Sequence, residues 1–484
     1  MLGFKKDALL VFVLLALTYA YFYQNPGWNG NSRLGLIFAF VQEGRLTIDS
    51  FHDKEGMRTG DKAFYDGHYY SDKAIGTSVV GSIVYLPMYW LMRFFDYNLP
   101  LFIVKYLLTF FVIGLPSAFA GSLMYVVCKF ISASKLRAFI VTIAITLGTM
   151  YLPYSTIFFG HQLAATLLFC AFFMIFQLKV KPDLCKNSHL FLIGLLLGLS
   201  LVTEYTTVVI VLPLIIYYFL VLWKEQSFRR IMSIAIPSSL GGLIPVAILL
   251  IYNALCFGNP LSIGYAHLES QFFRESMSQG IMGISWPRPM VLYYLTVHPA
   301  HGLFWQSPVL ITTLAGAYFI FRAKQYRMEA VITTIAFFSY LLINSGYYMW
   351  WGGWAFGPRH IIPMLPFLCL PLIFVPRRFF FTVVILGLVS VSQMFIVVAS
   401  TVLVPDNIFS KIDKLGYFQY SSIYSYCLKL LLDGKFAPNL GWKLFALKNW
   451  MSLLPITVAI LGTTGSFLAM ESARSGLKRR AVGQ

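Results

Sequence analysis

Residues 162–178 read QLAATLLFCAFFMIFQL, and no charged side chain interrupts them. Lys179, Lys181 and Lys186 follow within a few positions. An apolar helix of about this length crosses the ~30 Å hydrocarbon layer of a bilayer. A short loop rich in lysine and arginine after such a helix favours the cytoplasmic side. The stretch therefore predicts a membrane-spanning helix that ends at a cytoplasmic surface.

Apolar stretches of similar length recur along the whole chain. Hydrophobic residues make up 58% of its 484 residues and charged residues only 12%, whereas a soluble domain carries roughly 25% charged residues. We therefore expect an all-α polytopic membrane protein with about twelve transmembrane helices. The predicted spans are 8–24, 99–128, 137–157, 162–178, 189–203, 207–223, 231–252, 303–321, 329–348, 361–375, 379–403 and 449–470.

The basic residues indicate how these spans are oriented. The net charge is +18, but lysine and arginine occur in small groups between apolar segments. Because short basic loops stay in the cytoplasm, we expect both termini inside and a bacterial inner-membrane location. This topology requires residues 77–94 to lie along the outer surface as an interfacial helix. Membrane lipids are therefore expected partners, and nucleic acid is not.

The topology places most polar residues outside the membrane, in loops 25–98, 253–302 and 404–448. The cytoplasmic loops are too short to hold an active site. We expect a core over residues 1–375 that includes the first two outer loops, of which the first is catalytic. Residues 376–484 would then form C-terminal transmembrane helices with the third outer loop.

The first outer loop contains the residues that are most informative about chemistry. A carboxylate that accepts a proton and a cation that stabilises a phosphate are what group transfer requires. We take Arg33, Lys73, His68 and Tyr70 as candidate substrate or phosphate ligands. An ordinary hydrated loop is the alternative. The acidic residues concentrated in this loop are Glu43, Asp49, Asp53, Glu55, Asp61, Asp66 and Asp72.

Three residues outside the first loop are candidates for the same site. Glu204 lies at the predicted outer turn between two spans, where a carboxylate is costly and a functional role is the default hypothesis. His161 begins a span and would hydrogen-bond an acceptor or orient a carboxylate; the alternative is a packed interfacial residue. Arg359 follows a tryptophan-rich turn and offers bidentate phosphate recognition, unless it only anchors the chain at the interface.

Six short motifs of this chain form a recognisable series. They are NSR at 31–33, GRLTID at 44–49, GHYYSDKA at 67–74, FGH at 159–161, TEY at 203–205 and WWGGWAFGPRH at 350–360. Together they resemble the GT-C superfamily of membrane glycosyltransferases. The resemblance is to a bacterial branch related to protein mannosyltransferases and aminoarabinose transferases, and it covers about residues 8–375.

The resemblance implies a polyprenyl-phosphate sugar donor and inversion at the anomeric carbon, with an ionised carboxylate that removes the proton of the acceptor hydroxyl. Relatives often place an acidic pair just before the arginine that matches Arg33. This chain has Gly30 and Asn31 there. The acidic role is therefore expected elsewhere in the first loop.

Asp49 is the first candidate for the catalytic base, followed by Asp61 and Asp72, and Lys73 matches a lysine suited to phosphate binding. No cofactor is established by the sequence, and divalent metal remains open because some relatives use an ion with first-loop acids. We expect transfer of a hexose or pentose to a lipid, glycan or protein acceptor at the extracytoplasmic face. The alternative is a multi-pass transporter or flippase, for which repeated halves would be expected.

Overall fold

The protein is a bundle of long helices in the computed structural model, which describes residues 5–222, 228–406 and 421–482. Within those residues, 7 helices are long and apolar enough to cross a membrane: Leu101–Ser132, Gly160–Val180, Tyr205–Leu222, Met232–Phe257, Lys324–Gly346, Arg377–Ser400 and Asn449–Ala473. Shorter apolar helices accompany them: Asn187–Thr203, Pro308–Arg322, Arg359–Ile373 and Ser422–Leu432. The chain is a helical, multi-pass membrane protein, and the predicted fold class is confirmed.

The elements alternate between long helices and short connecting segments. The N-terminal half contains α1 (Lys6–Tyr21), α2 (Gly27–Phe38), β1 (Lys62–Tyr65), β2 (His68–Ser71), α3 (Gly76–Phe94), α4 (Leu101–Thr109), α5 (Leu115–Ser132), α6 (Lys135–Thr146), α7 (Tyr151–Tyr154), α8 (Gly160–Val180), α9 (Asn187–Thr203) and α10 (Val208–Leu222). The C-terminal half contains α11 (Phe228–Phe257), α12 (Gln271–Met277), α13 (Pro289–Thr296), α14 (Leu303–Gln306), α15 (Thr312–Arg322), α16 (Arg327–Gly346), α17 (Cys369–Ile373), α18 (Phe380–Ser400), α20 (Leu428–Leu432), α21 (Leu440–Phe445) and α22 (Leu454–Val482).

A helix lies within each predicted span, but some of these helices are shorter than a full crossing. The predicted span 361–375, for example, begins as a 3₁₀-helix, Arg359–Leu368, which contains Pro363 and Pro366. Proline lacks the backbone N–H that a regular α-helix needs, so the tighter coil takes its place. As a result, Arg359 starts a buried element of the bundle.

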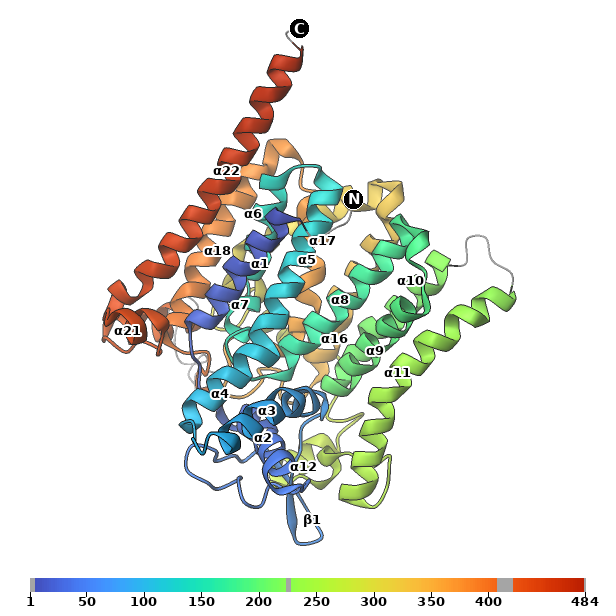
Figure 1. The fold of residues 1–484 in the computed structure, drawn as a ribbon, viewed down its shortest axis with the longest axis vertical. Coiled ribbons are helices and arrows are strands. Elements are labelled where there is room, and N and C mark those ends of the chain that lie inside the picture. Colours follow the sequence, from blue (N-terminus) through green and yellow to red (C-terminus); the bar gives the residue numbers. More distant parts are fainter. Residues whose placement is uncertain (1–4, 223–227, 407–420, 483–484) are drawn as a thin grey trace.

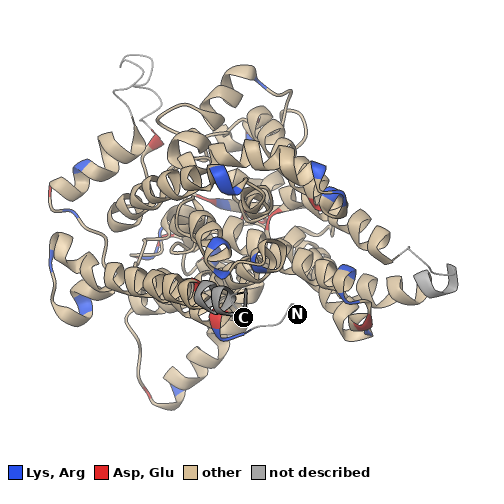
Figure 2. Cartoon of the chain, turned by 90° about the horizontal axis from the view of Figure 1, so that it is seen from above, with Lys and Arg blue, Asp and Glu red and all other residues tan. Residues whose placement is uncertain are grey.

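Few charged residues interrupt the bundle. Seen from above, isolated blue and red segments stand out against long tan helices (Figure 2). One acid inside the bundle, Glu329, is fully buried, and the Nζ atom of Lys179 lies 2.7 Å from its Oε1 atom. The Tyr217 hydroxyl donates to the same oxygen at 2.5 Å. A charge in this setting is costly unless it is paired, and here it has both an ion-pair and a hydrogen-bond partner.

The two ends of the bundle differ in character. In Figure 1 the start of α1 and the end of α22 lie at one end, and α2, α3, α12 and the β1–β2 hairpin lie at the other. The first loop thus forms a small folded layer across the spans. Its hairpin pairs Lys62 with Ser71 and Tyr65 with His68 in antiparallel register.

Helix α3 runs across the spans and not along them (Figure 1). Its outer face exposes Ile83, Trp90 and Phe94 at 69%, 64% and 81%, whereas Gly81 and Tyr85 are buried against the protein. An amphipathic helix that presents such side chains suits a position at the membrane surface. This arrangement agrees with the predicted interfacial helix at 77–94.

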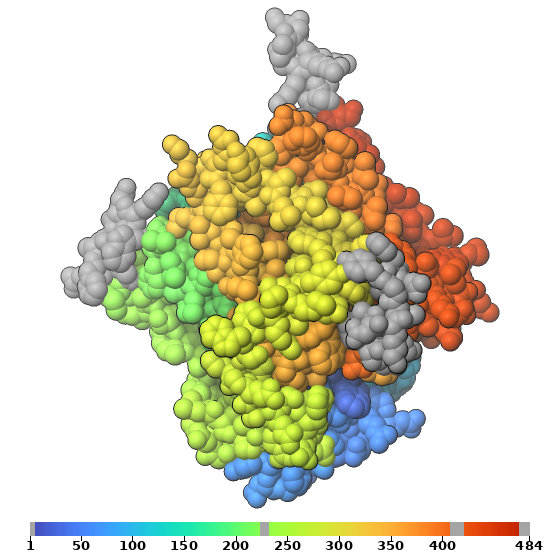
Figure 3. Space-filling view, turned by 180° about the vertical axis from the view of Figure 1, so that it is seen from behind, coloured from blue at the N-terminus to red at the C-terminus, as the bar shows by residue number. Residues whose placement is uncertain are grey.

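The second loop packs directly against the first. Leu268 forms a β-bridge with Ala63, and the backbone N–H of Glu269 donates to the carbonyl of Lys62 at 3.2 Å. From behind, the yellow-green second loop covers the middle of the molecule and meets the blue first loop below (Figure 3). Part of the predicted third loop, 404–448, falls at residues 407–420 and lies outside the described residues.

The topology predicts opposite labelling of the two ends of the bundle. A cysteine replacing Asp53, whose side chain is 65% exposed in the first loop, should react with a membrane-impermeant maleimide in intact cells. A cysteine replacing the exposed Lys324, before α16, should react only after permeabilisation. Cys185→Ser provides the background, because the other native cysteines are buried. Reversed labelling would place the first loop in the cytoplasm.

Candidate functional site

A cavity of about 300 Å³ lies where the folded first loop meets the ends of the spans. Its polar lining comes from α2, the first loop, the start of α8, the turn before α10 and the start of the Arg359–Leu368 helix. Its apolar lining comes mainly from α10, the second loop and the end of α16. The polar residues include Asn29, Arg33, Asp61, Asp72, Lys73, His161, Glu204, Arg359 and His360.

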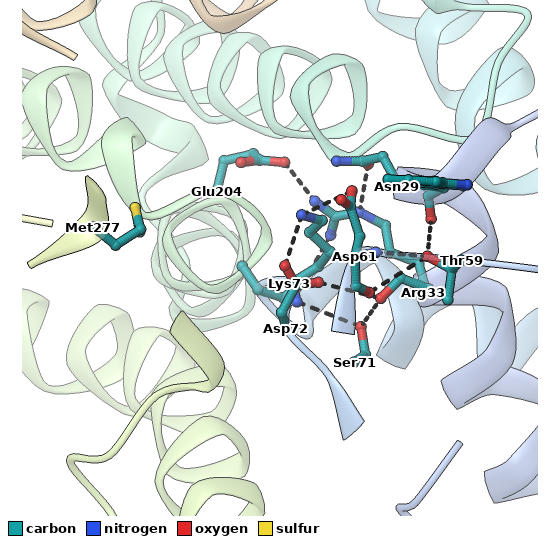
Figure 4. Close-up of polar contacts among 12 residues, drawn as sticks. Asn29, Arg33, Thr59, Asp61, Ser71, Asp72, Lys73, Glu204 and Met277 are labelled. Carbon is teal, nitrogen blue, oxygen red and sulfur yellow. Dashed lines mark hydrogen bonds and ion pairs between the residues drawn. The ribbon is translucent and has the colours of Figure 1, made fainter. Parts of the chain in front are cut away.

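Lys73 forms the centre of the charged part of this cavity. Its Nζ atom lies 3.0 Å from Asp61 Oδ2 and 2.9 Å from Asp72 Oδ2, as Figure 4 shows. The Ser32 hydroxyl lies 3.4 Å from Asp72 Oδ1 and 2.8 Å from the Ser71 hydroxyl. Two carboxylates thus flank one ammonium, and each carboxylate keeps an oxygen that is not engaged by Lys73 in these ion pairs.

Burial and charge set the protonation of this cluster. Burial raises the pKa of Asp72 above its ordinary value, the Lys73 ammonium offsets part of this shift, and Asp61 adds to it. For Lys73, burial would lower the pKa, but the carboxylates of Asp61 and Asp72 together raise it above its ordinary value. Lys73 therefore remains a cation in this cavity.

A second ion pair joins the first loop to the helical bundle. The Arg33 guanidinium is 1% exposed, and its Nη2 atom donates to Glu204 Oε1 at 2.8 Å. Its Nη1 atom donates to the Ala74 carbonyl at 2.8 Å, and Nε donates to Asn29 Oδ1 at 3.3 Å. The same Glu204 oxygen lies 3.4 Å from His161 Nδ1. Three elements, α2, α8 and the α9–α10 turn, therefore converge on one carboxylate.

Gly160 makes this convergence sterically possible. A Cβ atom added at this position would lie 2.4 Å from Glu204 Oε1 and 3.0 Å from Arg33 Nη2. Both distances are shorter than van der Waals contact, so any side chain here would push the ion pair apart. The FGH motif is thus explained locally: glycine admits the pair, and His161 follows it at the start of α8.

Arg359 and His360 complete the polar wall. The Arg359 guanidinium stacks 5.0 Å from the centre of the Phe159 ring, and the His360 ring lies 5.1 Å from the His161 ring. The Nε atom of Arg359 and the Nε2 atoms of both histidines are buried without a hydrogen-bond partner among the described residues. Buried polar atoms are normally hydrogen-bonded, so a bound ligand with acceptor groups would satisfy a need that the chain leaves open.

The structure brings most of the predicted site residues together. Four of the first-loop candidates, Asp61, Asp72, Arg33 and Lys73, line one cavity together with three candidates from elsewhere in the chain. Those contributed by other parts of the chain and predicted from the sequence are His161, Glu204 and Arg359.

Asp49, His68 and Tyr70 do not line this cavity. Asp49 accepts from the backbone N–H of Tyr69 at 2.7 Å and lies 2.8 Å from His68 Nδ1. Burial raises the pKa of Asp49, but these hydrogen bonds outweigh it and lower the pKa overall. Tyr70 is buried, and its ring packs 5.3 Å from the ring of Phe257. The three residues hold the hairpin and its neighbours together.

Several lining residues were not predicted from the sequence. Asn29, Tyr265, Tyr347 and His360 all face the cavity. The sequence contained a signal that could have identified His360, because this residue directly follows Arg359 within a predicted motif. No sequence signal marks Tyr265 as a cavity residue, since its position depends on how the second loop folds back onto the first.

The donor groups in the cavity do not fit a divalent metal. Lys73 Nζ occupies the position between Asp61 and Asp72 where a shared cation would be held. Across the described ranges, no group of three or more His, Cys, Asp or Glu side chains has the arrangement of a metal site. The position that a metal would take between the two carboxylates is here taken by an ammonium.

Comparisons with known proteins gave matches among solved structures. No family model matches the chain, and no curated protein matches it. The chain is similar to ArnT from Cupriavidus metallidurans bound to undecaprenyl phosphate, with 15% identity, a TM-score of 0.48 and coverage of 96% of this chain and 76% of that one. It is also similar to ArnT in the apo state, with 13% identity, a TM-score of 0.47 and coverage of 96% and 75%.

The Arg33–Glu204 and His68–Asp49 pairs should differ sharply in their effect on stability. Arg33→Gln leaves Glu204 buried without its cation, which should cost about 3 kcal/mol. His68→Gln removes an exposed partner from Asp49 and should cost less than about 1 kcal/mol, since the side chains of His68 and Asp49 are 56% and 35% exposed. Thermal unfolding in detergent measures both. A cost for Arg33→Gln as small as that expected for His68→Gln would show that Arg33 is not a structural link.

Proposed function

We propose that this chain is a GT-C-type membrane glycosyltransferase that moves a sugar from a polyprenyl-phosphate carrier to an envelope acceptor. The observation that carries the proposal is the buried Lys73, held between Asp61 and Asp72 in a cavity with largely apolar walls. A cation buried beside apolar surface suits a ligand with an anionic head and a hydrocarbon chain. A carboxylate next to that cation suits proton removal from an attacking hydroxyl.

Lys73 and Arg359 are the proposed phosphate ligands. Lys73 offers an ammonium, and Arg359 offers a planar guanidinium with an unpartnered Nε atom. As the bond between the anomeric carbon and the phosphate oxygen breaks, its electron pair moves to that oxygen. Fixed cations stabilise the charge that develops there, and they do so strongly where water is excluded.

Asp61 is the proposed catalytic base. Its side chain is 17% exposed, against 4% for Asp72, so it is the more accessible of the two carboxylates at Lys73. In the proposed step Asp61 accepts the proton of the acceptor hydroxyl while the hydroxyl oxygen bonds to the anomeric carbon. Attack opposite the departing phosphate inverts that carbon. Asp72 then serves mainly to hold Lys73 in place.

The ion pair of Arg33 and Glu204 has a positioning role in this proposal. Arg33 donates to the carbonyl of Ala74, the residue after Lys73, and so fixes the backbone beside the phosphate ligand. Glu204 in turn lies next to His161 Nδ1. With Nδ1 directed to a carboxylate, Nε2 of His161 is available to a substrate hydroxyl.

The proposed setting is the extracytoplasmic face of a bacterial inner membrane, with both termini in the cytoplasm. The support is the distribution of basic loops in the sequence and the position of the folded first loop at the end of the bundle away from the start of α1 (Figure 1). A lipid-linked sugar that has crossed the membrane would be presented at that face.

Replacing Asp61 should separate catalysis from folding. Asp61→Asn should lower the turnover number by about 10²–10⁴-fold, because the amide cannot accept a proton, while the protein keeps its unfolding temperature. Transfer of radiolabelled sugar from a polyprenyl-phosphate donor, by purified protein in nanodiscs, measures the effect. Asp49→Asn is the matched control and should retain turnover, since Asp49 lies outside the cavity lining.

Two results would contradict this assignment. Loss of transfer in Asp49→Asn, with full activity in Asp61→Asn, would move the base to the hairpin. Wild-type protein that carries the intact lipid-linked sugar across a vesicle membrane without transferring it would favour the flippase alternative.

Replacing Lys73 should change both carrier binding and the ionisation of Asp72. Lys73→Met removes the ammonium that lowers the pKa of Asp72, so this carboxyl should stay protonated to higher pH, which the infrared carbonyl band of the protonated carboxyl measures. Carrier affinity should fall by about tenfold or more, because the phosphate loses a cation. Lys54→Met, at an exposed lysine outside the cavity, is the control. A carrier affinity equal to that of the wild-type protein would remove Lys73 from the phosphate site.

A further inference from the structure

The mouth of the cavity can be located from the exposure of its lining residues. Among the residues that line it, Val208 is 39% exposed and Ile281 is 78% exposed, and the other lining residues are buried or half-buried. Val208 is the first residue of α10, and Ile281 lies in the second loop. The opening thus lies between a membrane span and a loop, and both side chains at its edge are apolar.

Val208 heads a stripe of exposed apolar residues on α10. Leu212, Ile216 and Leu220 follow at intervals of four residues and are 55%, 60% and 51% exposed. Residues four apart lie on the same face of an α-helix, and α10 belongs to a candidate membrane span. The cavity mouth is therefore continuous with a helix face that contacts lipid.

The neighbouring span α16 presents a similar face. Val331, Ile335, Phe338 and Leu342 are 45%, 38%, 56% and 44% exposed along this helix. Ile343, directly after Leu342, lines the cavity. Lipid-facing side chains of two spans therefore lead to the same opening.

The second-loop side of the mouth is a tight turn fixed to the end of α16. Gly280 and Gly283 have φ angles of 61° and 76°, which place the turn in the left-handed region that favours glycine. Ile284 forms a β-bridge with Tyr347, and the Ser285 N–H donates to the carbonyl of Gly346, the last residue of α16, at 2.9 Å. The turn thus lies at the level where the span ends.

Trp286 follows this turn and is 89% exposed. Arg288 also anchors the segment, since its Nε atom donates to the carbonyl of Ser345 at 3.2 Å. An exposed tryptophan beside the end of a span is typical of the boundary between lipid and water. The segment has apolar side chains directed away from the protein although its backbone is held in place.

We propose that residues 281–286 insert into the adjacent leaflet and form a lateral entrance between Val208 and Ile281. Through this entrance an amphiphile with an anionic head and a long hydrocarbon chain passes from the bilayer to Lys73. The identity of this ligand as a sugar carrier rests on the proposed function. The insertion of the segment into lipid does not, because it follows from exposure, spacing and backbone anchoring.

Spin-label accessibility tests the insertion directly. Nitroxide labels are attached to cysteines at positions 281 and 286 of the full chain, in the Cys185→Ser background, in nanodiscs of phosphatidylethanolamine and phosphatidylglycerol. Reference labels are placed at Leu240, which is 55% exposed on α11, and at the exposed tip of the hairpin, Asp66. Dissolved oxygen reports contact with hydrocarbon, and a water-soluble nickel chelate reports contact with water.

The proposal expects the labels at 281 and 286 to collide more with oxygen than with the nickel chelate, as at position 240. Accessibility to nickel equal to that at position 66 would overturn it, because the entrance would then open to water. This result is independent of enzymatic activity, so it separates a failure of the entrance from a failure of the proposed function.

A kinetic comparison tests passage through the entrance. Ile281→Glu places a charge at its edge and should raise the KM for a long-chain carrier about tenfold relative to a short-chain, water-soluble carrier. Leu261→Glu is the matched control, since Leu261 is 80% exposed in the same loop and does not line the cavity. An equal rise in KM for both carriers in Ile281→Glu would show that the residue affects the site and not entry from the bilayer.

Discussion

The ion pair between Arg33 and Glu204 is the interaction on which the rest of the site depends. It joins a helix of the first loop to the turn between two spans, and the guanidinium is almost fully buried. A buried pair of this kind contributes little net stability compared with apolar packing, but removal of one partner is costly. Its value lies in position: the same guanidinium holds the carbonyl of Ala74, next to Lys73. The ion pair therefore fixes the position of the folded first loop on the bundle.

The apolar wall of the cavity strengthens the electrostatic interactions within the charged cluster of Lys73, Asp61 and Asp72. Low polarity strengthens the interaction of Lys73 with Asp61 and Asp72, and these carboxylates keep the lysine charged despite its burial. A site of this kind is already organised before substrate arrives. Polar atoms left without partners, on Arg359 and His161, are available to ligand groups. Electrostatic preorganisation of fixed charges is an effective way to stabilise developing charge.

The sequence predicted the membrane fold well, because a run of apolar residues long enough to cross a bilayer has few other solutions. The high cost of charge near the membrane also singled out Glu204, and both Glu204 and Arg359, a candidate phosphate ligand, line the cavity. The sequence ranked Asp49 above Asp61, because both are acids in one loop and nothing in their spacing shows which faces inward. The folding of the first loop determines which acid faces the cavity, since it places Asp49 next to His68 and Asp61 next to Lys73. Tyr265 was equally inaccessible to sequence reasoning, since its place depends on contact between two distant loops.

The β-bridge between Ala63 and Leu268 makes the two loops a single mechanical unit. Glu269 adds a backbone hydrogen bond to Lys62, which directly follows Asp61. A ligand that displaced the second loop would therefore have to break these hydrogen bonds or displace strand β1 together with the loop. Movement of the second loop at the cavity mouth and the position of Asp61 are in this way linked through the main chain, and the ion pair between Lys62 Nζ and Glu269 Oε2, at 3.4 Å, strengthens the link.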